Sequence, residues 1–162
     1  MRSPTEPLPL PNCVPRARSS ANSFAPSGPG TDSALLNAML NVVITEGLVD
    51  EDFIRERVTG WEETRELVLQ YTPERVAKVC GLKPETIIAA AKLYGNAKAA
   101  MIYTARGLEH QSKGVDNGVC CANLALATGN FGRPGAGYMT LTGQGNGQGG
   151  REMGQKASQL PG

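Results

Sequence analysis

Apolar positions along the chain fall into short segments with helical periodicity, and glycines and prolines separate these segments. The most apolar segment follows Gly30, continues to Gly47 and is apolar on nearly all sides. Thr31 and Asp32 are residue types that favour the start of a helix, and glycine favours its end. The pattern therefore predicts a buried helix over residues 32–46.

Four shorter segments with a helical pattern follow. They begin at about Asp50, Trp61, Thr72 and Lys83, and three of them end by a glycine, at Gly60, Gly81 and Gly95. In the last two segments a proline comes directly after the first residue, and proline is favoured at the first helical position. The sequence thus predicts a run of short helices up to residue 95.

Residues 99–104 are short, apolar and typical of a strand, and they lead into a polar turn over residues 106–114. Residues 116–127 then predict another buried helix. A strand entering a loop that opens a helix is the unit that binds ligands at the carboxyl ends of strands in α/β folds. With one clear strand, we expect a helix-rich fragment of an α/β domain whose partner strands lie elsewhere.

The two ends of the chain differ from this central part. Residues 1–30 hold seven of the eleven prolines and few aliphatic side chains, so they cannot bury enough apolar surface to offset their ordering entropy. We expect a disordered or extended arm there, and a folded part over residues 31–162.

Glycine dominates the other end, because eleven of the twenty glycines fall in residues 128–162. Glycine lets the backbone approach a ligand closely. Hydrogen-bonding side chains stand between these glycines, at Gln144, Asn146, Gln148, Arg151 and Glu152. The composition predicts a Gly-rich loop region folded around a large polar cofactor, and a disordered glycine and glutamine tail remains the alternative.

Charge and cysteine usage narrow the function classes. A formal net charge of +1 gives no electrostatic footprint for nucleic acid, and no apolar run approaches the roughly 20 residues that cross a bilayer. No signal peptide is visible, which favours the cytoplasm.

The four cysteines form no C-x-x-C pair and the one histidine, His110, is distant from them, so zinc or iron–sulfur ligation by this chain alone is disfavoured. The adjacent Cys120 and Cys121 are expected to pack on a helix as small apolar residues.

Three segments, residues 29–37, 124–137 and 141–152, together resemble the molybdopterin oxidoreductases. That resemblance covers residues 29–162 and implies a bis(molybdopterin guanine dinucleotide) molybdenum cofactor. Within the family, the string TGQGNGQGGRE is most similar to catalytic subunits of assimilatory nitrate reductases. The resemblance predicts that the three glycine-containing turns share one ligand, a guanylated pterin.

The resemblance also assigns roles to individual positions. It implies that Asp32 contacts a guanine of the cofactor, where carboxylate oxygens accept from purine N–H groups, although a helix N-cap is an equal alternative. Gly107, His110 and Gln111 match the pterin-side loop of the family, in which His110 is more often a loop hydrogen-bonder than a catalytic base. Gln144 matches a polar residue close to the pterin and the metal. The expected cofactor-binding set is Asp32, Gly107, His110, Gln111, Thr142, Gly143, Gln144 and Asn146. No catalytic residue and no metal ligand is assigned.

Thr142 bears on the substrate. Formate dehydrogenases that resemble this region tend to carry arginine here, where a cation can hold the formate carboxylate. The neutral threonine therefore favours nitrate, reduced to nitrite, and predicts that the complete enzyme does not turn over formate.

Parts of the family pattern are not found in this sequence. The cysteine cluster for a [4Fe–4S] centre, the residue presented to molybdenum and the closing β-barrel-like domain are missing. The implied partners are the remainder of the enzyme or an electron-donor subunit. An inactive truncated cofactor-binding module, a formate dehydrogenase-like fragment and a helical interaction domain with a glycine-rich tail remain alternatives. A fragment of this kind is expected to expose apolar surface.

Overall fold

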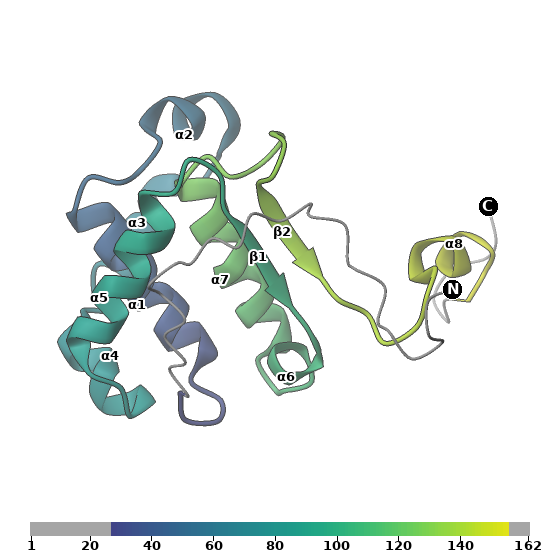
Figure 1. Ribbon diagram of the computed structural model, residues 1–162, viewed down its shortest axis with the longest axis horizontal. Coiled ribbons are helices and arrows are strands. Elements are labelled where there is room, and N and C mark those ends of the chain that lie inside the picture. The colour runs from purple at the N-terminus through teal and green to yellow at the C-terminus, as the bar shows by residue number, and fades with distance from the viewer. Residues whose placement is uncertain (1–26, 156–162) are drawn as a thin grey trace, which may run out of the picture.

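The computed structural model describes residues 27–155, which form a helix-rich α/β unit (Figure 1). In chain order its elements are α1 (Asp32–Thr45), α2 (Glu51–Arg57), α3 (Trp61–Val68), α4 (Pro73–Cys80), α5 (Pro84–Gly95), β1 (Met101–Thr104), α6 (Arg106–Glu109), α7 (Gly114–Ala127), β2 (Gly137–Thr140) and α8 (Gly147–Glu152). The predicted fold class, a helix-rich fragment of an α/β domain, is confirmed.

Local signals explain where the predicted helices begin. The Asp50 carboxylate accepts a hydrogen bond of 3.0 Å from the backbone N–H of Phe53 at the start of α2. The Thr72 hydroxyl accepts from the N–H of Arg75 at the start of α4. Each side chain satisfies a backbone donor that the first turn of a helix leaves without a partner. The expected helices between residues 32 and 95 are confirmed to within a few residues.

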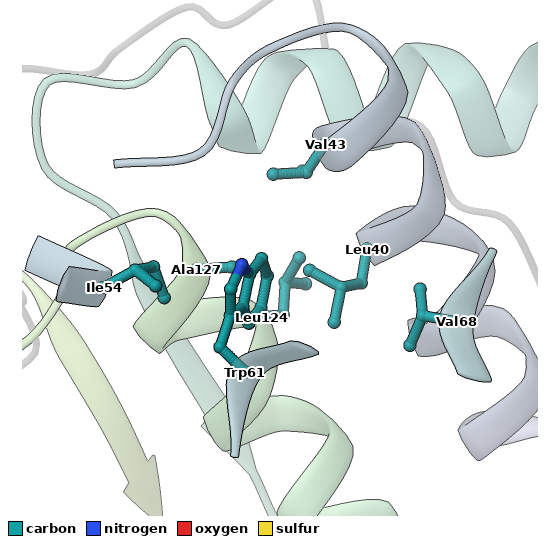
Figure 2. Close-up of a cluster of buried hydrophobic side chains, with 7 residues drawn as sticks. All are labelled: Leu40, Val43, Ile54, Trp61, Val68, Leu124 and Ala127. Atoms are coloured by element: carbon teal, nitrogen blue, oxygen red, sulfur yellow. The ribbon is translucent and has the colours of Figure 1, made fainter. Parts of the chain in front are cut away.

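The core forms around α1, which packs against α3, α4, α5 and α7. One cluster of buried side chains joins α1 to α2, α3 and α7 (Figure 2) and consists of Leu40, Val43, Ile54, Trp61, Val68, Leu124 and Ala127. A second cluster joins α1 to α4 and α5 and consists of Ala38, Val76, Ala77, Cys80 and Ile87. Burying one Leu, Ile or Val side chain stabilises the fold by about 1.5–3 kcal/mol. The nearly all-apolar sequence of α1 follows from its contacts on both sides.

The sheet consists of β1 and β2, which pair in parallel with Met101 opposite Gly137 and Thr104 opposite Thr140. The expectation that all partner strands lie elsewhere is therefore wrong, because one partner lies in the glycine-rich part of this chain. Helices α6 and α7 connect the two strands, as parallel strands require a long crossover. Figure 1 shows α8 beyond the carboxyl end of β2, away from the helices that surround α1.

Helix α7 covers one face of the sheet, and the other face is exposed. Helix α7 packs on both strands, and successive residues of a strand point to opposite faces. The uncovered face carries apolar side chains, Met101, Tyr103 and Met139, which continue into Leu141; each of the four is exposed. The expected exposed apolar surface is confirmed.

The end of the proline-rich arm is ordered. The N–H of Gly28 donates to the Cys80 carbonyl at 2.9 Å, and Pro29 and Gly30 form a turn before α1. Residues 1–26 of the predicted arm lie outside the described residues. Within the described range, no helix combines the length and apolar character needed to cross a bilayer.

Candidate functional site

Two loops leave the same edge of the sheet. Because β1 and β2 are parallel and in register, Thr104 and Thr140 end side by side at the carboxyl edge. The loop after β1 contains α6 and residues 110–113, and the loop after β2 contains residues 141–146. Ligands of α/β folds bind outside this edge, so the two loops define the candidate site.

The loop after β1 meets the start of α1 through Gln111. Its side-chain Nε2 donates to Asp32 Oδ2 at 3.3 Å, and it also donates to the Gly107 carbonyl oxygen. Three of the predicted site residues are thus brought together, although 79 positions separate Asp32 from Gln111. We expected Asp32 at a guanine and Gly107 and Gln111 in a pterin-side loop, whereas the structure places all three together in one group, the Asp32 group.

The alternative that Asp32 caps α1 is wrong. Thr31 occupies the N-cap position, and its hydroxyl donates to the Gly28 carbonyl at 2.6 Å. Asp32 is the first helical residue and is partly buried, where the partial positive charge of the helix N-terminus favours an anion. Among the described residues it accepts one side-chain hydrogen bond, from Gln111. A carboxylate has room for more acceptor contacts than this one.

Asn117 supports this group and was not singled out from the sequence. Its side chain is 2% exposed, and its Nδ2 donates to the Leu108 carbonyl at 2.9 Å. The Ser33 hydroxyl donates to Asn117 Oδ1. Asn117 therefore ties α6, α7 and the first turn of α1 together. The signal that could have identified it is a polar residue at a position that the predicted helix buries.

The thiol of Cys121, which lies near the Asp32 carboxylate, is unreactive at neutral pH. Burial, then the neighbouring Cys120 and the carboxylate of Asp32, raise the pKa of the Cys121 thiol to about 11. Burial also raises the pKa of Cys120. Both thiols are protonated at neutral pH, whereas nucleophiles and metal ligands need the thiolate. The prediction that this pair packs on a helix as small apolar residues is confirmed, with Cys121 1% exposed.

The loop after β2 borders a hollow of about 580 Å³ between the strand and α8. Side chains from both elements and from the loop line it, among them Tyr138, Met139, Thr140, Thr142, Asn146 and Arg151. The Thr142 hydroxyl donates to the Gln144 carbonyl at 2.8 Å and so shapes the loop. Thr142 and Asn146 therefore share one cavity, whereas Arg151 was not in the expected set.

The other expected residues lie near these two groups. Gly143 and Gln144 are exposed in the loop between Thr142 and Asn146. His110 is exposed, and its backbone N–H closes α6 by donating to the Arg106 carbonyl at 2.8 Å. No hydrogen bond of the described residues joins the Asp32 group to the hollow.

The glycine turn over residues 128–137 lies at the opposite edge of the sheet. The N–H of Gly137 donates to the Ala100 carbonyl at 3.1 Å, before the start of β1. The expectation that all three glycine turns share one ligand is therefore wrong for this turn, because parallel strands place their preceding and following loops at opposite edges.

A buried hydrogen-bond network explains what the turn over residues 128–137 does instead. Asn130 is 1% exposed, and its Oδ1 accepts from the N–H of Ala100 at 3.1 Å and from Arg133 at 2.8 Å. Its Nδ2 donates to the Thr128 hydroxyl at 2.8 Å. The turn thus fixes the end of α7 to the start of β1.

Metal-ligating side chains are scattered in this part of the chain. Within residues 27–155, no group of three or more His, Cys, Asp or Glu side chains is placed to hold a metal ion. What the described site offers is a carboxylate, amides, hydroxyls, a guanidinium and glycine backbone.

Comparison with known proteins identifies relatives of this arrangement. The family model described as molybdopterin oxidoreductase matches residues 18–162. The chain is 46% identical over 134 residues to an F420-dependent formate dehydrogenase subunit alpha of Methanococcus maripaludis and 42% identical to the assimilatory nitrate reductase catalytic subunit of Bacillus subtilis, over 83% of the chain in each case. It spans about a fifth of the length of these relatives (20% and 19%). Among solved structures, acetylene hydratase from Pelobacter acetylenicus is similar, with a TM-score of 0.65 and 30% identity over 68% of this chain and 15% of that one.

Proposed function

The chain belongs to the molybdopterin oxidoreductase family, and we propose that it supplies the cofactor-holding loops of a catalytic subunit. The cofactor we propose is bis(molybdopterin guanine dinucleotide), with one guanine at the Asp32 group. The contact between Asp32 and Gln111 carries this proposal, because it joins a carboxylate and an amide at the carboxyl edge of the sheet.

The residues present fit such a group. Guanine presents N–H donors and a carbonyl acceptor on one edge, so a carboxylate that accepts and an amide that both donates and accepts are complementary to it. Asp32 has acceptor capacity beyond its bond to Gln111. Gly107 adds an exposed backbone without a side chain over it. Asp32 and Gln111 would hold the guanine, and Gly107 would let the ring approach.

The cofactor and the protein would make different contributions to the reaction. When bound, the molybdopterin cofactor supplies the oxidation–reduction chemistry, and the protein supplies binding and orientation. In this chain the hydrogen bonds of Asn117 would hold the loop after β1 against α1. Thr142, Gly143 and Gln144 would follow the pterin through their exposed backbone, and His110 would contact the same ligand as a hydrogen-bonding side chain.

For the complete enzyme we propose formate as the substrate, oxidised to carbon dioxide with the release of two electrons and one proton. Support comes from the relatives, because the formate dehydrogenase subunit is 46% identical and the nitrate reductase subunit 42%. The argument against formate was that Thr142 is neutral, but Arg151 lines the same hollow as Thr142. A cation is therefore present in that cavity without an arginine at position 142.

Nitrate reduction is the second candidate. The nitrate reductase subunit of Bacillus subtilis covers the same share of this chain, and a guanidinium binds nitrate as well as a carboxylate. An inactive cofactor-binding module is the third possibility for a chain of this length.

Activity of the complete protein that contains this segment separates these candidates. We expect purified protein to hold molybdenum and to reduce benzyl viologen with formate. Oxidation of reduced methyl viologen by nitrate, without formate-dependent dye reduction, would overturn formate in favour of nitrate. Complete protein without molybdenum or pterin would overturn the cofactor proposal itself.

A further inference from the structure

A second hollow, of about 470 Å³, lies between α2 and the turn over residues 128–137, at the edge of the sheet opposite the candidate site. We call it the α2 groove, and it is lined by Phe53, Glu56, Arg57, Leu126, Phe131 and Gly132. Figure 1 shows α2 at one end of the molecule and α6 at the other. The α2 groove is therefore separate from the loops that would hold the cofactor.

The apolar side chains of the α2 groove lie outside the core. Phe53, Leu126 and Phe131 are partly buried, yet they belong neither to the two buried clusters nor to the side chains packed against them. The chain has three phenylalanines, and both of those in the described residues line this groove. Aromatic side chains that gather at the surface without serving the core are typical of interaction sites. Their position indicates that the α2 groove binds another molecule.

Hydrogen bonds fix the walls of the α2 groove. The N–H of Asp50 donates to the Ala127 carbonyl at 2.8 Å, which joins the start of α2 to the end of α7. The turn packs on the same residue, because a Cβ added to Gly129 would overlap Asp50 Oδ2. Asn130 Oδ1 accepts from the N–H of Ala100 at 3.1 Å and holds the turn against the start of β1. A partner would therefore bind a preformed surface and lose little affinity to ordering it.

The charge of α2 indicates the kind of partner. Phe53, Glu56 and Arg57 are spaced three and four positions apart, so they share one face of the helix. On α2 the ion pair of the described residues joins Arg55 to Asp52 at 2.6 Å, and Glu56 and Arg57 take part in none. Helix α2 and its N-cap contain four Asp or Glu and two Arg. Because potentials are complementary across interfaces, this acidic helix favours a basic partner.

We infer that the α2 groove docks an aromatic side chain carried by a basic segment of another protein. The aromatic ring packs against Phe53 and Phe131, and the guanidinium of Arg57 stacks on it, as arginine does on aromatic faces. Lysines or arginines on either side of the ring are attracted to Glu56. This inference depends on neither the cofactor nor the substrate of the complete enzyme.

Binding of three pentapeptides to the 162-residue chain tests the inference, with fluorescence anisotropy at low salt as the measurement. All three peptides carry the same label. The first has phenylalanine between two pairs of lysines, the second has alanine in place of the phenylalanine, and the third has glutamates in place of the lysines. We expect the first to bind at least tenfold more tightly than either of the others, because ring burial and attraction to the acidic helix both contribute.

Two aromatic variants test the groove itself. Phe131→Ala and Phe53→Ala should each bind the phenylalanine peptide about tenfold more weakly or worse, the effect of losing one buried ring contact. Leu67→Ala is the matched control, because Leu67 is 53% exposed on α3 and does not line the groove. Since neither phenylalanine belongs to a core cluster, both variants should keep the far-ultraviolet circular dichroism of the parent.

A charge variant tests the basic character of the partner without changing an apolar side chain. Glu56→Lys should weaken binding of the phenylalanine peptide about threefold or more and tighten binding of the glutamate peptide. Glu66→Lys makes the same change of charge at an exposed position of α3 that does not line the groove, and it should have a smaller effect on both peptides. Because Glu56 is exposed, this variant is expected to fold as the parent does.

Several results would overturn the inference. They are no peptide binding at millimolar concentration, equal binding of the phenylalanine and alanine peptides, parent affinity in both aromatic variants, and equal effects of Glu56→Lys and Glu66→Lys. If capped phenylalanine alone binds as tightly as the first peptide, the occupant is a small ligand and the inferred partner is wrong. If Phe131→Ala abolishes self-association of the chain, the occupant is a second copy, which also overturns it.

Discussion

Gln111 donates a hydrogen bond to the carboxylate of Asp32 at 3.3 Å, and this contact joins the loop after β1 to the start of α1. The same amide holds the Gly107 carbonyl. One side chain thus fixes both the conformation of its own loop and the position of that loop against a distant helix. The candidate guanine site depends on this double attachment.

Replacing Gln111 with alanine should separate binding from folding. We expect the Gln111→Ala chain to lose measurable guanosine affinity, while its free energy of unfolding falls by only about 1 kcal/mol, the usual net value of a partly exposed hydrogen bond. Titration calorimetry and urea denaturation measure the two effects. Ser112→Ala, next to it and exposed, is the control and should change neither. Full guanosine affinity in Gln111→Ala would rule out the amide as a ligand group.

Gly129 and Gly132 allow a test of the turn at the opposite edge. Both have positive φ, 61° and 72°, but a Cβ on Gly129 would lie 2.3 Å from Asp50 Oδ2, whereas one on Gly132 meets nothing within 4 Å. Gly132→Ala should cost about 1–2 kcal/mol in the free energy of unfolding, the cost of the left-handed conformation alone. Gly129→Ala should cost clearly more, because a neighbouring side chain must also move. Equal costs in urea denaturation would show that Asp50 swings away freely.

Most helices could be predicted because their signals are local. Asp50 and Thr72 accept hydrogen bonds from residues three positions later, so each cap is contained in a few adjacent letters of the sequence. Strand β2 could not be predicted in this way. Its four residues, Gly137–Thr140, form a strand because they pair with β1. The glycine-rich sequence around them contains no local signal that predicts this pairing.

The candidate site was predictable to a similar extent. Asp32, Gly107 and Gln111 were named from the family resemblance, but as a guanine-side and a pterin-side position, so their mutual contacts were not predicted. The turn over residues 128–137 was misplaced because glycine content does not say at which edge of a sheet a loop lies. Arg151 was named only as one of several hydrogen-bonding side chains of the glycine-rich region, because the hollow that it lines, between α8 and β2, is a tertiary feature.

The buried thiol of Cys121 predicts a pH dependence of stability. Burial is the main cause that raises its pKa in the folded chain from 9.0 to about 11, so between these values the native state keeps a proton that the unfolded state loses. The contribution is therefore fully present below pH 9 and is lost as pH rises through 11. We expect the free energy of unfolding to fall over this window, and to fall less steeply in Cys121→Ala. Urea denaturation at several pH values measures both slopes. Parallel slopes would show that other groups, such as Tyr94 and Cys120, cause the whole effect.

The uncovered sheet face should govern self-association of the isolated chain. Parallel sheets are normally covered on both faces, yet Tyr103 and Met139 are 55% and 45% exposed on adjacent strands. Since an exposed apolar patch promotes association, Tyr103→Lys with Met139→Glu should lower light scattering and binding of a hydrophobic dye. The pair adds opposite charges and leaves the net charge unchanged, so general repulsion is not the cause. Leu93→Glu, on α5 and 53% exposed, is the control and should have a smaller effect. If the parent chain is a monomer with a sharp cooperative melt, or if Leu93→Glu reduces scattering as much as the pair does, the sheet face is not the surface responsible.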